Sequence, residues 1–195
     1  MARQSMRAHI VDAAAERFHT HGYNAAGVKD ITDAAGVPKG SFYNHFESKE
    51  ALAVTILDLY GQTRRLEDLA DESVAPLARL RGHFEFLRTE QEGYDYARGC
   101  LLGNFGAEIG DHSDVLREQV QQGFAHWREA LAGALADAVR LGDVDAALDP
   151  QTTALFLLSA WEGALLAART GRSGAPFDAF FSNIFERLLQ RPAAS

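Results

Sequence analysis

Apolar residues recur along this chain every three or four positions, which is the spacing of one face of an α-helix. Met6, Ile10, Ala14 and Phe18 form the first such stripe, and it stops before Gly22. No stretch alternates apolar and polar residues in the way that a half-buried strand does. The pattern therefore predicts an all-α fold.

A second, shorter helical pattern is followed by a turn. Val28, Ile31 and Ala35 are spaced as one helix face. Gly36 then suits the left-handed conformation at a helix end, and Pro38 suits the first turn of the next helix because it has no amide hydrogen to place. Two short helices joined by a tight glycine turn indicate a helix-turn-helix, whose second helix reads the major groove of DNA.

The second helix of this motif is predicted at about residues 38–46. Phe42 and Phe46 are four apart and are expected to face inward, which turns the other positions toward solvent. Small residues permit close approach to DNA, lysines offer charge to phosphates, and polar side chains can reach base edges. The candidate DNA-binding residues are Lys39, Gly40, Ser41, Tyr43, Asn44, His45 and, beyond the helix, Lys49. The same spacing also fits a plain helical hairpin with a solvated face.

The remainder of the chain continues as longer amphipathic segments that suit a helical bundle. Ser48 suits the cap of a fourth helix, and Asp149 followed by Pro150 suits the start of a later one. The last helix is predicted at residues 177–190. We therefore divide the chain into a helix-turn-helix domain at residues 1–47 and a ligand-binding and dimerisation domain at residues 48–195.

The last two predicted helices are apolar on more than one side, so each must be covered on more than one side. Burial inside one subunit and burial against a second subunit both satisfy this requirement. We favour a subunit interface, because the two helices are terminal and adjacent in sequence. The candidate interface residues are Phe156, Trp161, Phe177, Phe181, Ile184, Phe185 and Leu188.

The charge distribution strengthens the prediction of a DNA-binding end. The net charge is -8, yet residues 1–50 carry six basic and six acidic groups and hold all the lysines of the chain. A duplex would repel the acidic remainder and tolerate the amino-terminal part, which would orient the molecule on DNA.

Other chemistry is sparse. A single cysteine, Cys100, excludes an internal disulfide framework. No glycine-rich phosphate loop, nucleophile elbow or metal-ligand triad is visible, so we expect neither an enzyme nor a cofactor or metal site. The longest apolar run, residues 154–161, falls short of the roughly 20 residues that cross a bilayer, and charged residues interrupt any secretory signal. We therefore expect a cytoplasmic protein with no membrane partner.

The amino-terminal motif resembles the signature of the TetR family of bacterial transcriptional regulators. The matching residues, within residues 7–56, are Phe18, Gly22-Tyr23, Asp30-Ile31, Ala35-Gly36-Val37, Gly40-Ser41-Phe42-Tyr43, His45-Phe46 and Ser48-Lys49-Glu50. The resemblance implies a homodimer that binds a palindromic operator in double-stranded DNA, with the last two helices of each subunit forming a four-helix bundle.

The resemblance also implies roles for single residues. Lys39, Tyr43 and Lys49 fall where the family commonly contacts phosphates, and the recognition surface lies on or near Ser41, Asn44 and His45. The chain departs from the pattern before its second helix, where Ala26 and Gly27 replace the usual hydroxyl residues and leave that edge of the footprint open.

A ligand pocket in the carboxy-terminal bundle is implied by the same resemblance. The segment RGCLLGN, residues 98–104, resembles a subgroup that includes regulators of electrophile and aldehyde detoxification, some of which sense through cysteine. Cys100 is then either a buried small hydrophobe or a thiolate, activated by Arg98 or a helix start, that adds to an electrophile. Candidate pocket residues are Asn104 as a polar fixing point and the aromatic residues Phe84, Phe105, Phe124, Trp127 and Trp161, although such aromatics are more often core.

Together these expectations describe a ligand-responsive repressor that leaves its operator when a small-molecule inducer, with an electrophile as one candidate, occupies or modifies the sensor domain. An activator and a helical interaction protein that binds no DNA remain alternatives.

Overall fold

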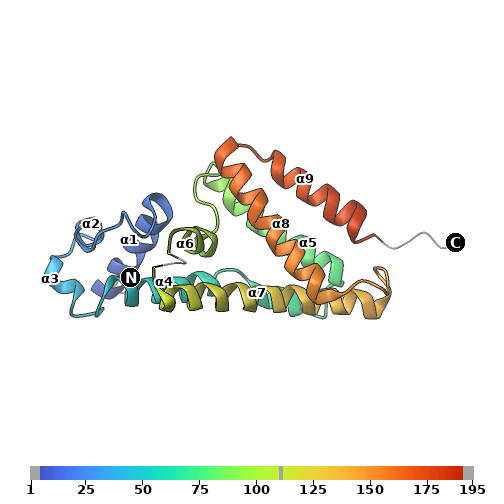
Figure 1. The fold of residues 1–195 in the computed structure, drawn as a ribbon, viewed down its shortest axis with the longest axis horizontal. Helices are drawn as coiled ribbons and strands as arrows, with labels where there is room; N and C mark the ends of the chain where they lie inside the picture. The colour runs from blue at the N-terminus through green and yellow to red at the C-terminus, as the bar shows by residue number, and fades with distance from the viewer. Residues whose placement is uncertain (1–4, 110–111, 191–195) are drawn as a thin grey trace. The chain divides into compact units, whose positions relative to one another are not determined.

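The computed structural model describes residues 5–109 and 112–190, and every regular element in these ranges is helical, as the periodicity predicts. The chain forms two compact units. Unit 1 comprises residues 1–63 and 100–123, and unit 2 comprises residues 64–99 and 124–195. Helix α7 (Asp114–Leu141) contributes its first turns to unit 1 and the rest to unit 2 (Figure 1).

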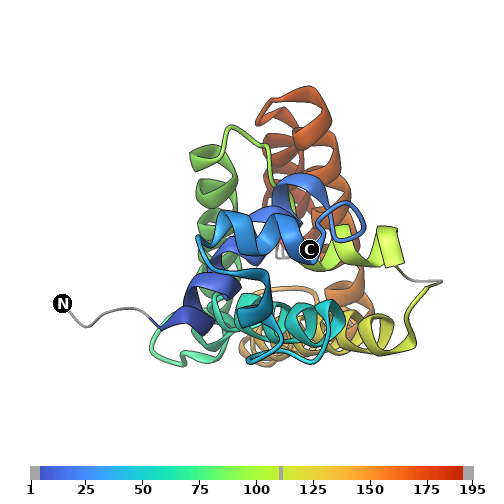
Figure 2. The ribbon, with the colours of Figure 1, turned by 90° about the vertical axis from the view of Figure 1, so that its left-hand side faces the viewer.

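Unit 1 is built from α1 (Met6–His21), α2 (Val28–Ala34), α3 (Lys39–Phe42), α4 (Lys49–Gln62) and α6 (Leu101–Ile109), together with the start of α7. Helix α1, blue in Figure 2, packs against α2, α4 and α6. Ile10, Phe18, Ile31, Phe42 and Leu52 are fully buried in this unit. The core therefore forms around the apolar stripes that the sequence predicts.

The boundaries of α1 and α4 have local causes. Ser5 and Ser48 cap the two helices, since their hydroxyls accept from Ala8 N at 3.2 Å and Ala51 N at 3.0 Å. Helix α1 ends at Gly22, where the chain takes a φ of +82° that favours glycine. The predicted cap of the fourth helix is confirmed.

Helix α3 is shorter than predicted. The sequence indicates a helix at about residues 38–46, but α3 ends at Phe42 and residues 43–45 form a turn. The carbonyl oxygen of Phe42 accepts from both His45 N and Phe46 N, each at 3.0 Å. This tightened turn ends the helix, and the chain is extended at Ser48 before α4 begins.

Unit 2 contains α5 (Pro76–Gly93), most of α7, α8 (Pro150–Gly171), α9 (Ala175–Asn183), the 3₁₀-helix η1 (Leu66–Ala70) and η2 (Ile184–Leu188). The predicted start of α8 is confirmed, because Asp149 accepts from Thr152 N at 2.6 Å and Pro150 opens the helix. The last predicted helix is divided, since α9 gives way to a π-helical turn at η2 that Leu189 closes on Ile184. No helix in the described ranges combines the length and apolarity needed to cross a membrane.

Candidate DNA-binding surface and sensor core

The exposed side of α3 and its following turn carries the predicted DNA-binding residues. Phe42 and Phe46 are buried with ring centroids 5.8 Å apart, and they anchor the segment to unit 1. A Cβ on Gly40 would meet nothing within 4 Å, so its small size leaves the approach from solvent open. Ser41 is half-buried, and the exposed members of the set are Lys39, Gly40, Tyr43, Asn44 and His45.

Lys49 differs from the other predicted phosphate contacts because it has partners inside unit 1. Its Nζ donates to the carbonyl oxygen of Tyr23 at 2.9 Å and lies 4.1 Å from the centroid of the Tyr23 ring. Burial lowers the pKa of Lys49, and the negative charge of Glu108 acts in the opposite direction. A phosphate would have to compete with these contacts for the ammonium group.

The edge of the surface before α2 is stabilised without a hydroxyl residue. Gly27 occupies the cap position, and its amide donates back to Asp30 Oδ2 at 3.1 Å. Ala26 is buried. Asp30 thus satisfies one of the free amides at this helix start, although no side-chain hydroxyl is offered to a phosphate there.

Asn24 is used for a different contact within unit 1. Its backbone amide donates to Glu108 Oε2 at 3.0 Å, and its side chain donates to the Glu108 carbonyl oxygen at 3.4 Å. On the same helix α6, the ring of Phe105 lies 5.5 Å from that of Phe18 and 5.4 Å from that of Tyr23. Helix α6 is therefore joined to the loop between α1 and α2 by both polar and aromatic contacts.

The predicted sensor residues divide between the two units. Cys100, Asn104 and Phe105 belong to unit 1, where Asn104 N donates to the Cys100 carbonyl oxygen at 2.9 Å as α6 begins. Cys100 is 4% exposed. The other predicted pocket residues, all in unit 2, are Phe84, Phe124, Trp127 and Trp161.

An aromatic cluster fills the core of unit 2. The Trp161 ring lies 5.1 Å from Phe84 and stacks on Phe177 at 4.9 Å, and Phe180 lies 4.8 Å from Phe84. Phe124 is half-buried outside this cluster. Trp161 and Phe177, which we also predicted at the subunit interface, thus have their contacts within the subunit.

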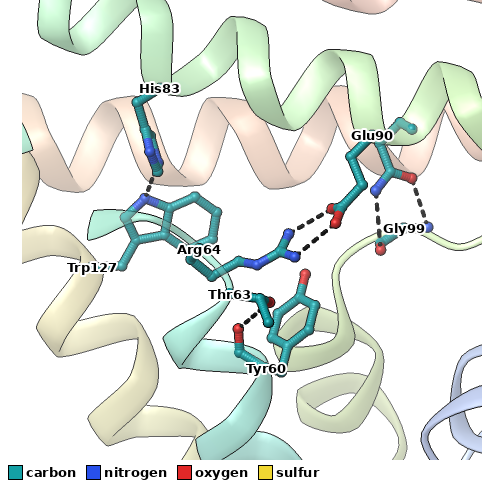
Figure 3. A network of polar contacts seen from close by, with 8 residues as sticks. Tyr60, Thr63, Arg64, His83, Glu90, Gly99 and Trp127 are labelled. Atoms are coloured by element: carbon teal, nitrogen blue, oxygen red, sulfur yellow. Dashed lines mark hydrogen bonds and ion pairs between the residues drawn. The ribbon is translucent and has the colours of Figure 1, made fainter. Parts of the chain in front are cut away.

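Figure 3 shows polar side chains that the sequence analysis did not identify, among them His83, whose ring lies 5.4 Å from that of Phe84 in the cluster. His83 Nε2 accepts a hydrogen bond from Trp127 Nε1 at 2.8 Å. The side chain of Arg64 is 5% exposed, and both of its terminal nitrogens donate hydrogen bonds to the Glu90 carboxylate, at 2.6 and 2.8 Å. In the sequence, His83 and Glu90 could have been noticed as polar residues among the apolar positions Leu80, Phe84 and Leu87, whereas Arg64 lies outside α5 and carries no such signal.

The same helix fixes the segment that leads to Cys100. Gln91 accepts from Gly99 N at 3.0 Å, and its amide group donates to the Gly99 carbonyl oxygen at 3.4 Å. Gly99 has a φ of +70°, which glycine adopts without strain.

His83 stays neutral at physiological pH. Burial lowers its pKa to about 3, and the positive charges of Arg64 and Arg65 act in the same direction. Since Nε2 accepts from Trp127, the proton of the neutral ring lies on Nδ1.

The predicted interface residues differ in exposure. Trp161, Phe177, Phe181 and Ile184 are buried in the subunit, and Phe185 is half-buried. The exposed large apolar side chains on α8 and η2 are Leu155, Phe156, Leu166 and Leu188. Among the described residues, no group of three or more His, Cys, Asp or Glu side chains is placed to hold a metal ion.

Two family models match the chain. Residues 10–56 match the model described as bacterial regulatory proteins, tetR family, and residues 76–184 match the tetracyclin repressor-like, C-terminal domain. The chain belongs to the TetR family of transcriptional regulators. This confirms the family that the sequence motif indicates, and the members of this family are DNA-binding regulators rather than enzymes.

Individual relatives match over nearly the whole chain. The HTH-type transcriptional repressor DhaR of Mycobacterium sp. (strain GP1) is 38% identical over 97% of this chain and 95% of its own length. The transcriptional regulator AcuR of Cereibacter sphaeroides is 36% identical over 93% and 84%. The crystal structure of regulatory protein TetR from Rhodobacter sphaeroides aligns with a TM-score of 0.85 and 31% identity, covering 91% of this chain and 96% of that one.

Proposed function

We propose that this TetR-family regulator is a homodimeric repressor that binds a palindromic operator through α3 and leaves it when a small molecule binds. The observation that carries the proposal is the exposed surface of α3 and its turn, where Lys39, Tyr43, Asn44 and His45 are open to solvent above buried phenylalanines. A protein of this function would act in the cytoplasm on chromosomal DNA.

Dimerisation is part of the proposal because one short helix reads few base pairs. Two recognition helices related by a twofold axis would engage half-sites about 34 to 36 Å apart. The proposed contact is the exposed face of α8, on which Leu155, Ser159, Gly163 and Leu166 follow helical spacing. Ser159 and Gly163 are small enough to let a partner helix approach closely.

The operator contact is tested by removing a lysine. Lys39→Ala is expected to weaken binding to every operator alike and to reduce the slope of log affinity against log salt by about one, because one phosphate contact is lost. Mobility-shift titrations at several salt concentrations, with DNA from the promoter region of the gene that encodes this chain, measure the affinity and the salt slope. Arg140→Ala removes the same charge from unit 2 and should leave the slope unchanged. An unaltered slope for Lys39→Ala would exclude this residue from the footprint.

An electrophile is the narrower candidate for the inducer. Cys100 directly precedes α6 and is buried, so an adduct on its thiol would add volume to a close-packed interior and shift that helix. We expect N-ethylmaleimide to release the wild-type protein from DNA, with the sulfur bonding to one alkene carbon while the other takes a proton. Cys100→Ser should bind DNA normally and resist release, as followed by mobility shift and mass spectrometry. Full release of Cys100→Ser would rule out covalent sensing at this thiol.

A further inference from the structure

The buried face of α5 carries polar residues where a bundle helix normally carries apolar ones. Arg79, His83 and Gln91 are buried, and Glu90 is a quarter exposed. Burying such groups is unfavourable unless each finds hydrogen-bond partners. Glu90 and Gln91 have the partners described above, and Arg79 donates to Asp137 at 2.9 Å.

His83 has a donor that these contacts do not satisfy. Its Nε2 is occupied by Trp127, so its hydrogen is on Nδ1. Among the residues that the structure describes, no acceptor lies within hydrogen-bonding distance of Nδ1, and the residue is 3% exposed. A fixed N–H group is therefore buried in unit 2 without an acceptor.

Aromatic side chains surround this donor. The His83 ring lies 5.4 Å from the ring of Phe84 and 5.7 Å from that of Trp127, and both pairs are T-shaped. Binding sites of this kind combine apolar walls with a few fixed polar groups that set orientation and specificity. The nearby positive charge of Arg64 and Arg65 makes the N–H group a better donor to an oxygen.

We propose that the Nδ1–H of His83 selects the effector of this regulator, and that the effector carries a hydrogen-bond acceptor oxygen, an inference that rests on the small-molecule response proposed above. An effector with such an oxygen satisfies a buried donor that a hydrocarbon of the same shape leaves unpaired. Sites with buried polar groups reject analogues that lack the matching atom. The expected preference for the oxygen compound is about tenfold or more.

The test uses the full chain labelled with ¹⁵N-histidine and three probes of similar size. Butan-2-one offers a carbonyl oxygen, butyrate offers a carboxylate, and 2-methylbut-1-ene replaces the carbonyl oxygen of the ketone with a CH₂ group. We expect one of the oxygen compounds to shift the His83 Nδ1–H resonance and to bind about tenfold or more tightly than the alkene. The arm that responds more strongly distinguishes a neutral carbonyl from a carboxylate. Equal binding of the alkene, or an unmoved resonance with both oxygen compounds, would overturn the proposal.

Two variants and a matched control extend the test. His83→Leu should lower affinity for the oxygen probe to the level of the alkene, whereas His126→Leu, at an exposed position, should not change it. Trp127→Phe keeps an aromatic ring but no longer fixes the His83 tautomer, so a smaller loss is expected. The wild-type resonance decides the question if either variant folds poorly. Because binding is measured without DNA, a probe that binds at His83 but fails to release the operator would refute the proposed function and leave the site standing.

Discussion

Replacement of Leu166 by glutamate is expected to convert the proposed dimer into monomers and to lower operator affinity by about 100-fold or more. Leu166 is 65% exposed on α8, on the face that also carries Leu155 and Phe156. In a dimer, each subunit would have to bury this carboxylate in the interface without a partner, and an unpaired buried charge is strongly unfavourable. A monomer holds one half-site at a time and loses the gain from simultaneous binding.

Light scattering and mobility-shift titration measure the two effects. Leu141→Glu is the matched control, since Leu141 is also an exposed leucine, 57% accessible, but lies at the end of α7 and outside the proposed interface. It introduces the same charge into unit 2, so it should remain dimeric and bind DNA with little change. A dimeric Leu166→Glu with wild-type operator affinity would remove this face of α8 from the interface.

Acidification is expected to destabilise the fold through His83. The pKa of this residue falls from 6.5 to about 3 in the folded state, so between these values the unfolded chain binds a proton that the folded chain does not. The stabilisation is complete above pH 6.5 and is lost as the pH falls toward 3. The contribution of this residue to the free energy of unfolding should decrease by about 2 kcal/mol between pH 7.5 and 5.

Denaturant titrations of wild type and His83→Leu isolate this contribution from that of the other histidines. The free energy of unfolding of the wild type minus that of His83→Leu should fall as the pH falls, since only the wild type has this group to titrate. His126→Leu replaces an exposed histidine and should follow the wild-type slope closely. Parallel pH profiles for wild type and His83→Leu would show that the ring is protonated as readily in the folded state as in the unfolded chain.

The parts of this fold that the sequence predicted correctly are those with local causes. Ser48 and the Asp149-Pro150 pair start helices because a side-chain oxygen reaches an amide three residues later. Gly36 adopts the left-handed φ of +67° that the turn before α3 requires. The exposed set on α3 followed from the inward anchoring of Phe42, which depends only on spacing within one helix.

The parts that escaped prediction depend on partners distant in the chain. Periodicity identifies Trp161 and Phe177 as apolar, but their stacking on each other follows from how α8 and α9 pack. Leu59 follows Leu52 and Ile56 at helical spacing, which by itself predicts burial, yet Leu59 is 41% exposed. The tautomer of His83 is fixed by a hydrogen bond from Trp127, which is 44 residues away in the sequence.

The contacts of α6 have a consequence for recombination between regulators. Residues 100–123 share a compact unit with the DNA-reading helices, through Phe105 against Phe18 and Glu108 against Asn24. A crossover to another regulator placed just after α3 would pack α1 against an α6 from that other protein. The side chains of the two helices would then not be complementary. The compact unit that holds α3 is thus encoded by two separated stretches of sequence, and we expect a chimera that keeps its packing intact to need both.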